Sequence, residues 1–153
     1  MLTLLSTPAN SRAERLRSAV AGLFFCLACV GVAIALWAHV VSLLGFDPRM
    51  YFHWTWVVQL ILLTLLIPIM IEIMRTRLAG IHLFPAPHWQ KRLLVALIVY
   101  YTLQFYLFIW LASDHLESYA TWRMYSAGWL LLFTLCAIYY SVRMRPSRGG
   151  KSG

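Results

Sequence analysis

The chain has 153 residues, of which 61% are hydrophobic and 12% are charged, and its mean hydropathy is +0.72. A soluble domain is about half apolar and about one quarter charged, so this composition excludes an ordinary soluble protein. The net charge of +8 is not spread evenly, because nearly all of the 13 Lys and Arg residues lie before, between or after the long apolar runs. A membrane span needs about 20 apolar residues, so the length accommodates four spans and no soluble domain.

The first apolar run predicts a membrane span at residues 18–44. Ser11 and Glu14 have the spacing of a capping box, which predicts a helix that begins near Arg12. The segment is longer than a bilayer requires, so we expect it to tilt or to extend into the interface.

The second span is predicted at residues 54–74. Asp47 can cap this helix, and Pro48 then takes its first position, where a missing N–H costs nothing. Pro68 lies inside the span, so we expect a kink there and a backbone carbonyl released for another partner.

The second half of the chain repeats this organisation. A basic segment at 75–92 leads to a third span at 93–113. Asp114 and Glu117 again have capping-box spacing before a fourth span at 120–142, and a flexible basic tail follows at 143–153. The whole chain, 1–153, is therefore interpreted as one four-helix membrane domain.

The basic residues predict the orientation of these spans. All Lys and Arg except Arg49 and Arg123 lie before the first span, in the 75–92 segment or after the fourth span. Positive charge stays on the cytoplasmic side, so we predict an antiparallel four-helix bundle with both termini in the cytoplasm. Charge in this arrangement suits anionic lipid better than nucleic acid, and we predict no nucleic-acid partner.

Three cysteines suggest two interpretations. Cys26 and Cys29 form a C-x-x-C pair, and Cys136 is predicted at a comparable depth, so a soft-metal or dithiol site is geometrically feasible. Packing is the preferred interpretation, because Gly22, Cys26, Cys29 and Ala33 form a stripe of small residues that lets helices approach closely. A neighbouring stripe has the same character: Ala28, Gly31, Ala35 and Ala38. We therefore expect the first span to be the most buried of the four and predict no metal site.

Three histidines fall near the predicted outer side: His39, His53 and His115. Imidazoles at one level, near carboxylates, can ligate a metal or a haem iron. Only His39 lies clearly within a helix, and no H-x-x-H or E-x-x-H spacing supports a preformed site. We predict no cofactor, and retain His39 as the candidate ligand of a haem b in an alternative hypothesis.

Glu72 is the one acidic residue inside a predicted span, and an intramembrane carboxylate is a candidate for moving protons or ions. It lies three residues before Arg75, so an i,i+3 ion pair at the inner end is the preferred interpretation. Gln59 and Gln104 are interpreted as polar residues that join helices. No pattern indicates a catalytic residue.

Two short motifs carry a family resemblance. The segment Val41-Ser42-Leu43-Leu44-Gly45-Phe46-Asp47-Pro48, together with Arg123-Met124-Tyr125-Ser126 and Trp129, resembles small uncharacterised four-helix membrane proteins of bacteria. This resemblance implies a multi-pass protein of the bacterial inner membrane and no particular activity.

From these observations we expect a non-enzymatic accessory or interaction subunit, or a homo-oligomeric scaffold. Its partners would be the lipid bilayer and other membrane protein subunits or copies of itself. One alternative is a redox membrane anchor subunit that holds haem or quinone near His39. A second alternative is a small proton-coupled transporter that uses Glu72.

Overall fold

The computed structural model describes residues 8–47, 55–75, 87–112 and 117–144, and the regular structure in these ranges is entirely helical. Its helices are α1 (Pro8–Leu43), α2 (Thr55–Arg75), α3 (His88–Ala112) and α4 (Glu117–Arg143). Each contains a stretch long and apolar enough to cross a membrane. The predicted all-α class with four membrane-length helices is confirmed, and the chain is a multi-pass membrane protein.

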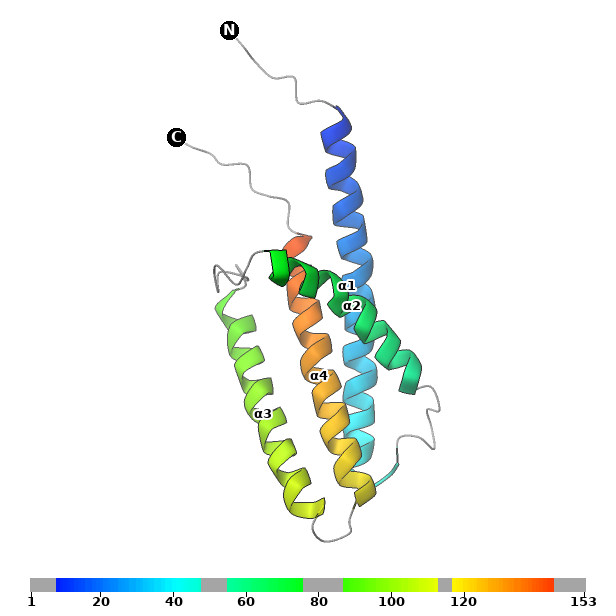
Figure 1. The fold of residues 1–153 in the computed structure, drawn as a ribbon, viewed down its shortest axis with the longest axis vertical. Coiled ribbons are helices and arrows are strands. Elements are labelled where there is room, and N and C mark those ends of the chain that lie inside the picture. Colours follow the sequence, from blue (N-terminus) through cyan, green and yellow to red (C-terminus); the bar gives the residue numbers. More distant parts are fainter. Residues whose placement is uncertain (1–7, 48–54, 76–86, 113–116, 145–153) are drawn as a thin grey trace.

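Helices α1 and α4 form the largest interface of the molecule and run in opposite directions. Phe24, early in α1, packs edge-on against Tyr140, late in α4, while Arg123, early in α4, contacts Ser42 near the end of α1. Figure 1 shows α3 alongside α4 and α2 crossing α1 and α4 obliquely. The N-terminal turns of α1 project beyond the other helices, since its 36 residues span about 54 Å at 1.5 Å per residue.

The core follows the seam between α1 and α4. Ala28, Ala35, Phe133 and Cys136 are each fully buried there. A Cβ built on Gly31 would lie 2.2 Å from Cδ1 of Phe133, so the Phe133 ring rests directly on the α1 backbone. Gly31 therefore provides the space that Phe133, the largest fully buried side chain among the described residues, occupies.

Of the described helices, α4 is the most buried, which corrects the expectation that the first span would be. Half of its most apolar stretch is buried, compared with 22% for α1 and α2 and none for α3. The physical reason is that α4 contacts all three other helices, whereas α1 packs mainly through the single face that it presents to α4.

The small-residue stripe that we singled out on α1 does not form the packing face within the chain. Cys26, Cys29 and Ala33 are exposed and Gly22 is half-buried. The neighbouring stripe is buried instead: Ala28, Gly31, Ala35 and Ala38. The two stripes are almost equivalent in size and polarity, so the position of Phe133 decides which of them packs.

The helix ends differ from the predicted starts. Helix α1 begins at Pro8, so Ser11 lies inside it and the predicted start near Arg12 is wrong. Proline suits a first helical turn because its missing N–H has no partner there in any case. Helix α3 begins at His88, where the Pro87 carbonyl accepts the N–H of Gln90 at 3.0 Å. Lys91 therefore lies on the helix and not in a loop.

The C-terminus of α1 has a Schellman-type cap. Gly45 adopts a positive φ of 84°, a conformation that costs glycine little. Its N–H donates to the Ser42 carbonyl at 3.2 Å, and the Phe46 N–H donates to the Val41 carbonyl at 3.1 Å. The last carbonyls of α1 are thus partly satisfied before any other helix contributes.

Some predictions concern segments outside the described residues. These are the Pro48 helix start, the Asp114 cap, the positions of His53 and His115, most of the 75–92 segment, and the tail from 145 onward.

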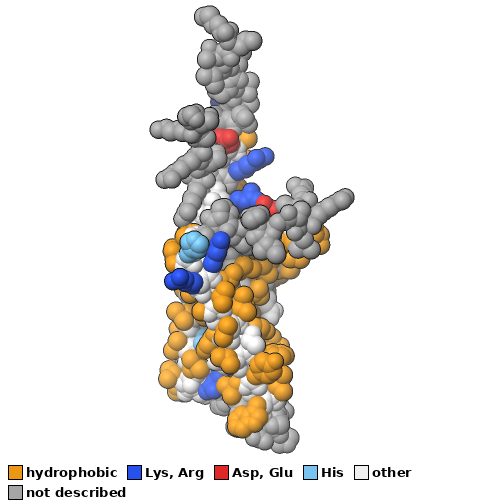
Figure 2. Space-filling view, turned by 90° about the vertical axis from the view of Figure 1, so that its left-hand side faces the viewer, with side chains coloured by type: hydrophobic (Ala, Val, Ile, Leu, Met, Phe, Trp, Pro, Cys, Tyr) orange, Lys and Arg blue, Asp and Glu red, His pale blue; other side chains and the backbone are white. Residues whose placement is uncertain are grey.

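Figure 2 shows how charge and hydrophobic side chains are distributed on one face. Lys and Arg side chains gather above a broad hydrophobic region, and a further basic side chain lies near the opposite end. Among the described residues, the basic side chains of α1 and α3 are exposed: Arg12, Arg15, Arg17, Lys91 and Arg92. This zoning is what a membrane protein shows where its helices leave the hydrocarbon.

Candidate functional site

Polar side chains within the described helices gather in two groups at opposite ends of α4. We call the first the His39 cluster, consisting of His39, Ser42, Tyr100, Arg123 and Ser126. We call the second the Glu72 cluster, consisting of Glu72, Tyr139, Tyr140 and Arg143.

In the His39 cluster, the imidazole lies where α1, α3 and α4 meet, and only 4% of His39 is exposed. Its Nδ1 is 2.8 Å from the Ser126 hydroxyl oxygen, and its Nε2 is 2.5 Å from the Tyr100 hydroxyl oxygen. Both ring nitrogens therefore have a partner, each from a different helix.

The directions of these hydrogen bonds follow from the serine. The Ser126 hydroxyl donates to the Trp122 carbonyl at 2.6 Å, so its oxygen can only accept from His39. The proton of a neutral imidazole then sits on Nδ1, and Nε2 accepts from the Tyr100 hydroxyl. Each donor in this series of hydrogen bonds therefore has an acceptor, as is usual for buried polar groups.

This closed network bears on the predicted haem ligand. Coordination of an iron through Nε2 would displace Tyr100, and coordination through Nδ1 would displace Ser126. Either exchange leaves a hydroxyl that has lost its partner. The geometry assigns His39 a structural role that joins three helices.

Arg123 completes the cluster from α4. Its Nε donates to the Ser42 carbonyl at 3.2 Å, and its Nη2 donates to the Leu43 carbonyl at 3.4 Å. A cation at these carbonyls also complements the negative end of the α1 dipole. Both hydrogen bonds described for Arg123 are therefore with the C-terminal end of α1.

In the Glu72 cluster, the carboxylate joins α2 to α4. The Tyr139 hydroxyl donates to one carboxylate oxygen of Glu72, and Arg143 forms an ion pair with the other. The side chain of Glu72 is 31% exposed and that of Arg143 is 51% exposed, so solvent screens the pair. The sequence suggested Arg75 as the partner, whose side chain lies outside those that are described.

Tyr140 makes the second link between α4 and α2. Its hydroxyl donates to the Leu65 carbonyl at 2.8 Å. Pro68 has no N–H to offer the carbonyl of Thr64, four residues earlier in α2. Tyr140 bonds the next carbonyl, that of Leu65, and so links α4 to α2 close to its proline.

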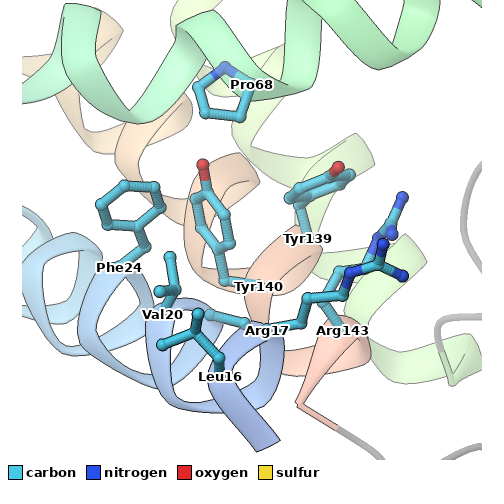
Figure 3. Close-up of a pocket in the computed structure, with 9 residues that line it drawn as sticks. Leu16, Arg17, Val20, Phe24, Pro68, Tyr139, Tyr140 and Arg143 are labelled. Carbon is cyan, nitrogen blue, oxygen red and sulfur yellow. The ribbon is translucent and has the colours of Figure 1, made fainter. Parts of the chain in front are cut away.

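A cavity of about 550 Å³ lies beside the Glu72 cluster, among α1, α2 and α4 (Figure 3). Its walls combine apolar side chains with two tyrosine rings and two guanidinium groups. They are Leu16, Arg17, Val20, Ala21, Phe24, Pro68, Tyr139, Tyr140 and Arg143. In Figure 3 the Arg17 and Arg143 side chains extend to the same side of this cavity, from α1 and α4 respectively.

The two glutamines that we expected to join helices show no such bond in the described part of the chain. Gln59 is exposed on α2. Gln104 is half-buried on α3, and its side-chain carbonyl oxygen is buried without a hydrogen-bond partner among the described residues. Amide groups of this kind inside a membrane favour a neighbouring helix over lipid.

The alternative interpretation of the cysteines was a soft-metal or dithiol site that brings Cys26, Cys29 and Cys136 together. Cys136 is buried in the seam, while Cys26 and Cys29 are exposed on α1. Within the described ranges, no three His, Cys, Asp or Glu residues are grouped so that they could hold a metal ion.

Sequence reasoning missed Tyr100, Ser126, Tyr139 and Arg17 as members of these sites. Ser126 follows Arg123 by three residues, so both lie on one face of α4, and this spacing was an available signal. Tyr100 gave none, because an aromatic residue inside an apolar run is equally suited to contact lipid.

No protein-family model, curated protein or solved structure matches the chain.

Proposed function

We propose that the chain is a multi-pass protein of the bacterial inner membrane, antiparallel and with both termini in the cytoplasm. Its role is that of a non-enzymatic interaction subunit or scaffold, which associates with copies of itself or with other membrane proteins. The orientation is supported by the basic residues, since exposed Arg12, Arg15 and Arg17 open α1 and exposed Lys91 and Arg92 open α3.

The observation that carries this proposal is the outward-facing surface of α1. Cys26, Cys29 and Ala33 are exposed there, although bulky apolar side chains fill the space between a helix and lipid better. A stripe of small residues is the surface that a neighbouring helix packs against in a membrane. The exposed amide of Gln59 on α2 adds a polar group that a partner helix can satisfy and lipid cannot.

Native mass spectrometry of the protein in mild detergent tests the proposal. Integer multiples of the 17.6 kDa chain would support a homo-oligomer, and the added mass of a second polypeptide would support a subunit. A single 17.6 kDa chain with no bound polypeptide, found also in detergents that preserve other complexes, would contradict both forms of the proposal.

The cysteines provide a second test in intact membranes. Oxidation should produce a disulfide-linked species through Cys26 or Cys29, because both are exposed, and not through buried Cys136. The matched controls are a Cys136→Ala variant, which should still cross-link, and a C26A/C29A variant, which should not. Cross-linking that persists in C26A/C29A would show that this face of α1 is not the interface.

The redox and transport alternatives have less support. Both ring nitrogens of His39 are already hydrogen-bonded, and the carboxylate of Glu72 is held between Tyr139 and Arg143. In each case the polar group links helices of this chain to one another.

A further inference from the structure

The cavity beside the Glu72 cluster combines two kinds of surface. Leu16, Val20, Phe24 and Pro68 give it an apolar side, while Arg17 and Arg143 lie together on another side. Water alone would be a poor occupant of the apolar side, and hydrocarbon alone a poor occupant of the cationic one. An occupant that satisfies both must be an amphiphile with a negatively charged group.

The charges around the cavity define that group more closely. Arg143 is balanced by Glu72, whereas Arg17 has no ion pair among the described residues. The hydroxyls of Tyr139 and Tyr140 already donate to Glu72 and to the Leu65 carbonyl, so the donors left to an occupant are guanidinium N–H groups. Among the described residues this leaves one surplus positive charge, which matches one negative charge, and Arg is well suited to phosphate oxygens.

The cavity also lies where a lipid headgroup would be. Arg17 is the last basic residue before the apolar stretch of α1, and Arg143 ends α4 on the same side of the molecule. This is the level at which helices pass from hydrocarbon to headgroups. A volume of about 550 Å³ lies within the 300–1,000 Å³ typical of small-molecule clefts, and admits a headgroup with the first part of an acyl chain.

We propose that this cavity binds one anionic phospholipid of the adjacent leaflet, with its phosphodiester at Arg17 and Arg143 and an acyl chain against Val20, Phe24 and Pro68. The site is a fixed position for a single lipid, distinct from general attraction between a basic protein and an anionic surface. It does not depend on whether the protein associates with itself or with another subunit.

Native mass spectrometry of the full chain in mild detergent tests this proposal by lipid titration. The probes are phosphatidylglycerol and phosphatidylcholine with identical acyl chains. We expect the first phosphatidylglycerol to bind with at least about fivefold higher affinity than the first phosphatidylcholine, the size of effect that one basic side chain produces at an anionic membrane surface. Equal affinities for the two lipids would overturn the proposal.

Two variants distinguish binding at this cavity from a general effect of the positive charge of α1. Arg17→Gln should reduce the preference for phosphatidylglycerol to near unity, while Arg15→Gln should retain it. Arg15 is the matched control because it is exposed on the same helix, carries the same charge and does not line the cavity. Equal losses in the two variants would show that only the total charge of α1 matters.

Two further measurements define the chemistry of the occupant. Val20→Trp should weaken binding of the first phosphatidylglycerol by filling the apolar side, and the position tolerates the change because Val20 is 44% exposed. Circular dichroism confirms that the variant is folded. Glycerol phosphate at the same concentration should fail to displace the lipid. Displacement by glycerol phosphate, or unchanged binding in folded Val20→Trp, would exclude a lipid whose acyl chain occupies the cavity.

Discussion

The His39 and Glu72 clusters lie at the two ends of α4, and both tie this helix to its neighbours with polar side chains. They differ in almost every other respect. His39 is buried, its network is closed by neutral hydroxyls and backbone carbonyls, and its ring nitrogens have no capacity left. Glu72 is part of an ion pair that is partly exposed beside an open cavity.

The difference shows which polar groups of a membrane protein hold it together and which remain available. A buried network in which every donor has an acceptor stabilises one arrangement of helices, because any change leaves a polar group without a partner. A charged cluster next to open space has donors to spare and is screened by solvent. We therefore expect the His39 end to control stability and the Glu72 end to control ligand binding.

The largest effect should come from the seam that joins the two ends. Gly31→Leu places a side chain where Phe133 already lies, and should lower the free energy of unfolding by about 3 kcal/mol, the upper part of the range for overpacking. Unfolding in mixed micelles, followed by circular dichroism, measures this loss. The control is Ala33→Leu, because Ala33 is exposed on the same helix. Equal stability of the two variants would contradict the packing described for Gly31.

At the His39 end, His39→Ala should lower the free energy of unfolding by about 2 kcal/mol. The substitution removes two hydrogen bonds and leaves the Tyr100 and Ser126 hydroxyls without their shared partner. The control is His88→Ala, because His88 is exposed on α3. The same samples test the haem alternative: a Soret band in the wild-type protein that His39→Ala abolishes would assign His39 to a cofactor.

A smaller effect is expected where Arg123 meets the end of α1. Arg123→Gln removes the cation from the Ser42 and Leu43 carbonyls, and should cost about 1 kcal/mol. Hydrogen exchange should become faster for the last turn of α1. Arg143→Gln is the matched control at the other end of α4 and should leave that turn protected. Equal exchange in both variants would show that Gly45 alone caps the helix.

The smallest effect on stability should be that of Glu72→Gln, at about 0.5 kcal/mol, because its ion pair is partly exposed. The loss should shrink further at high salt, where the wild-type pair is screened. The double variant Glu72→Gln/Arg143→Gln should lose no more unfolding free energy than the two single variants lose together. A loss as large as that of His39→Ala would remove the distinction between the two clusters.

The sequence was sufficient to predict the four membrane helices, because hydropathy is a local property and the apolar runs are long. It was not sufficient to predict the packing face of α1. Ala28, Gly31, Ala35 and Ala38 resemble the stripe that contains Cys26 and Cys29, and the choice between them is made by Phe133, about a hundred residues later.

The sequence also could not show which residues His39 and Glu72 contact, because their partners are distant in the chain. His39 and Glu72 were identified from their residue types inside apolar runs. Their partners were not, since Tyr100 and Ser126 lie 61 and 87 residues from His39. For Glu72 the sequence suggested Arg75, whose side chain is not among those described, and gave no sign of Arg143, which the structure brings to it across 71 residues. Local spacing identifies candidates, and tertiary contacts identify what they bind.

The seam between α1 and α4 has a consequence for biosynthesis. It joins α1 to α4, the first and last of the four described helices, so the core between them cannot form until α4 has entered the bilayer. Until then, Gly31 of α1 lacks its contact with Phe133, and α3 lacks its main packing partner, α4. Packing of the α1–α4 core therefore follows the synthesis of α4, and we expect chains truncated before α4 to leave the buried stripe of α1 without its partner.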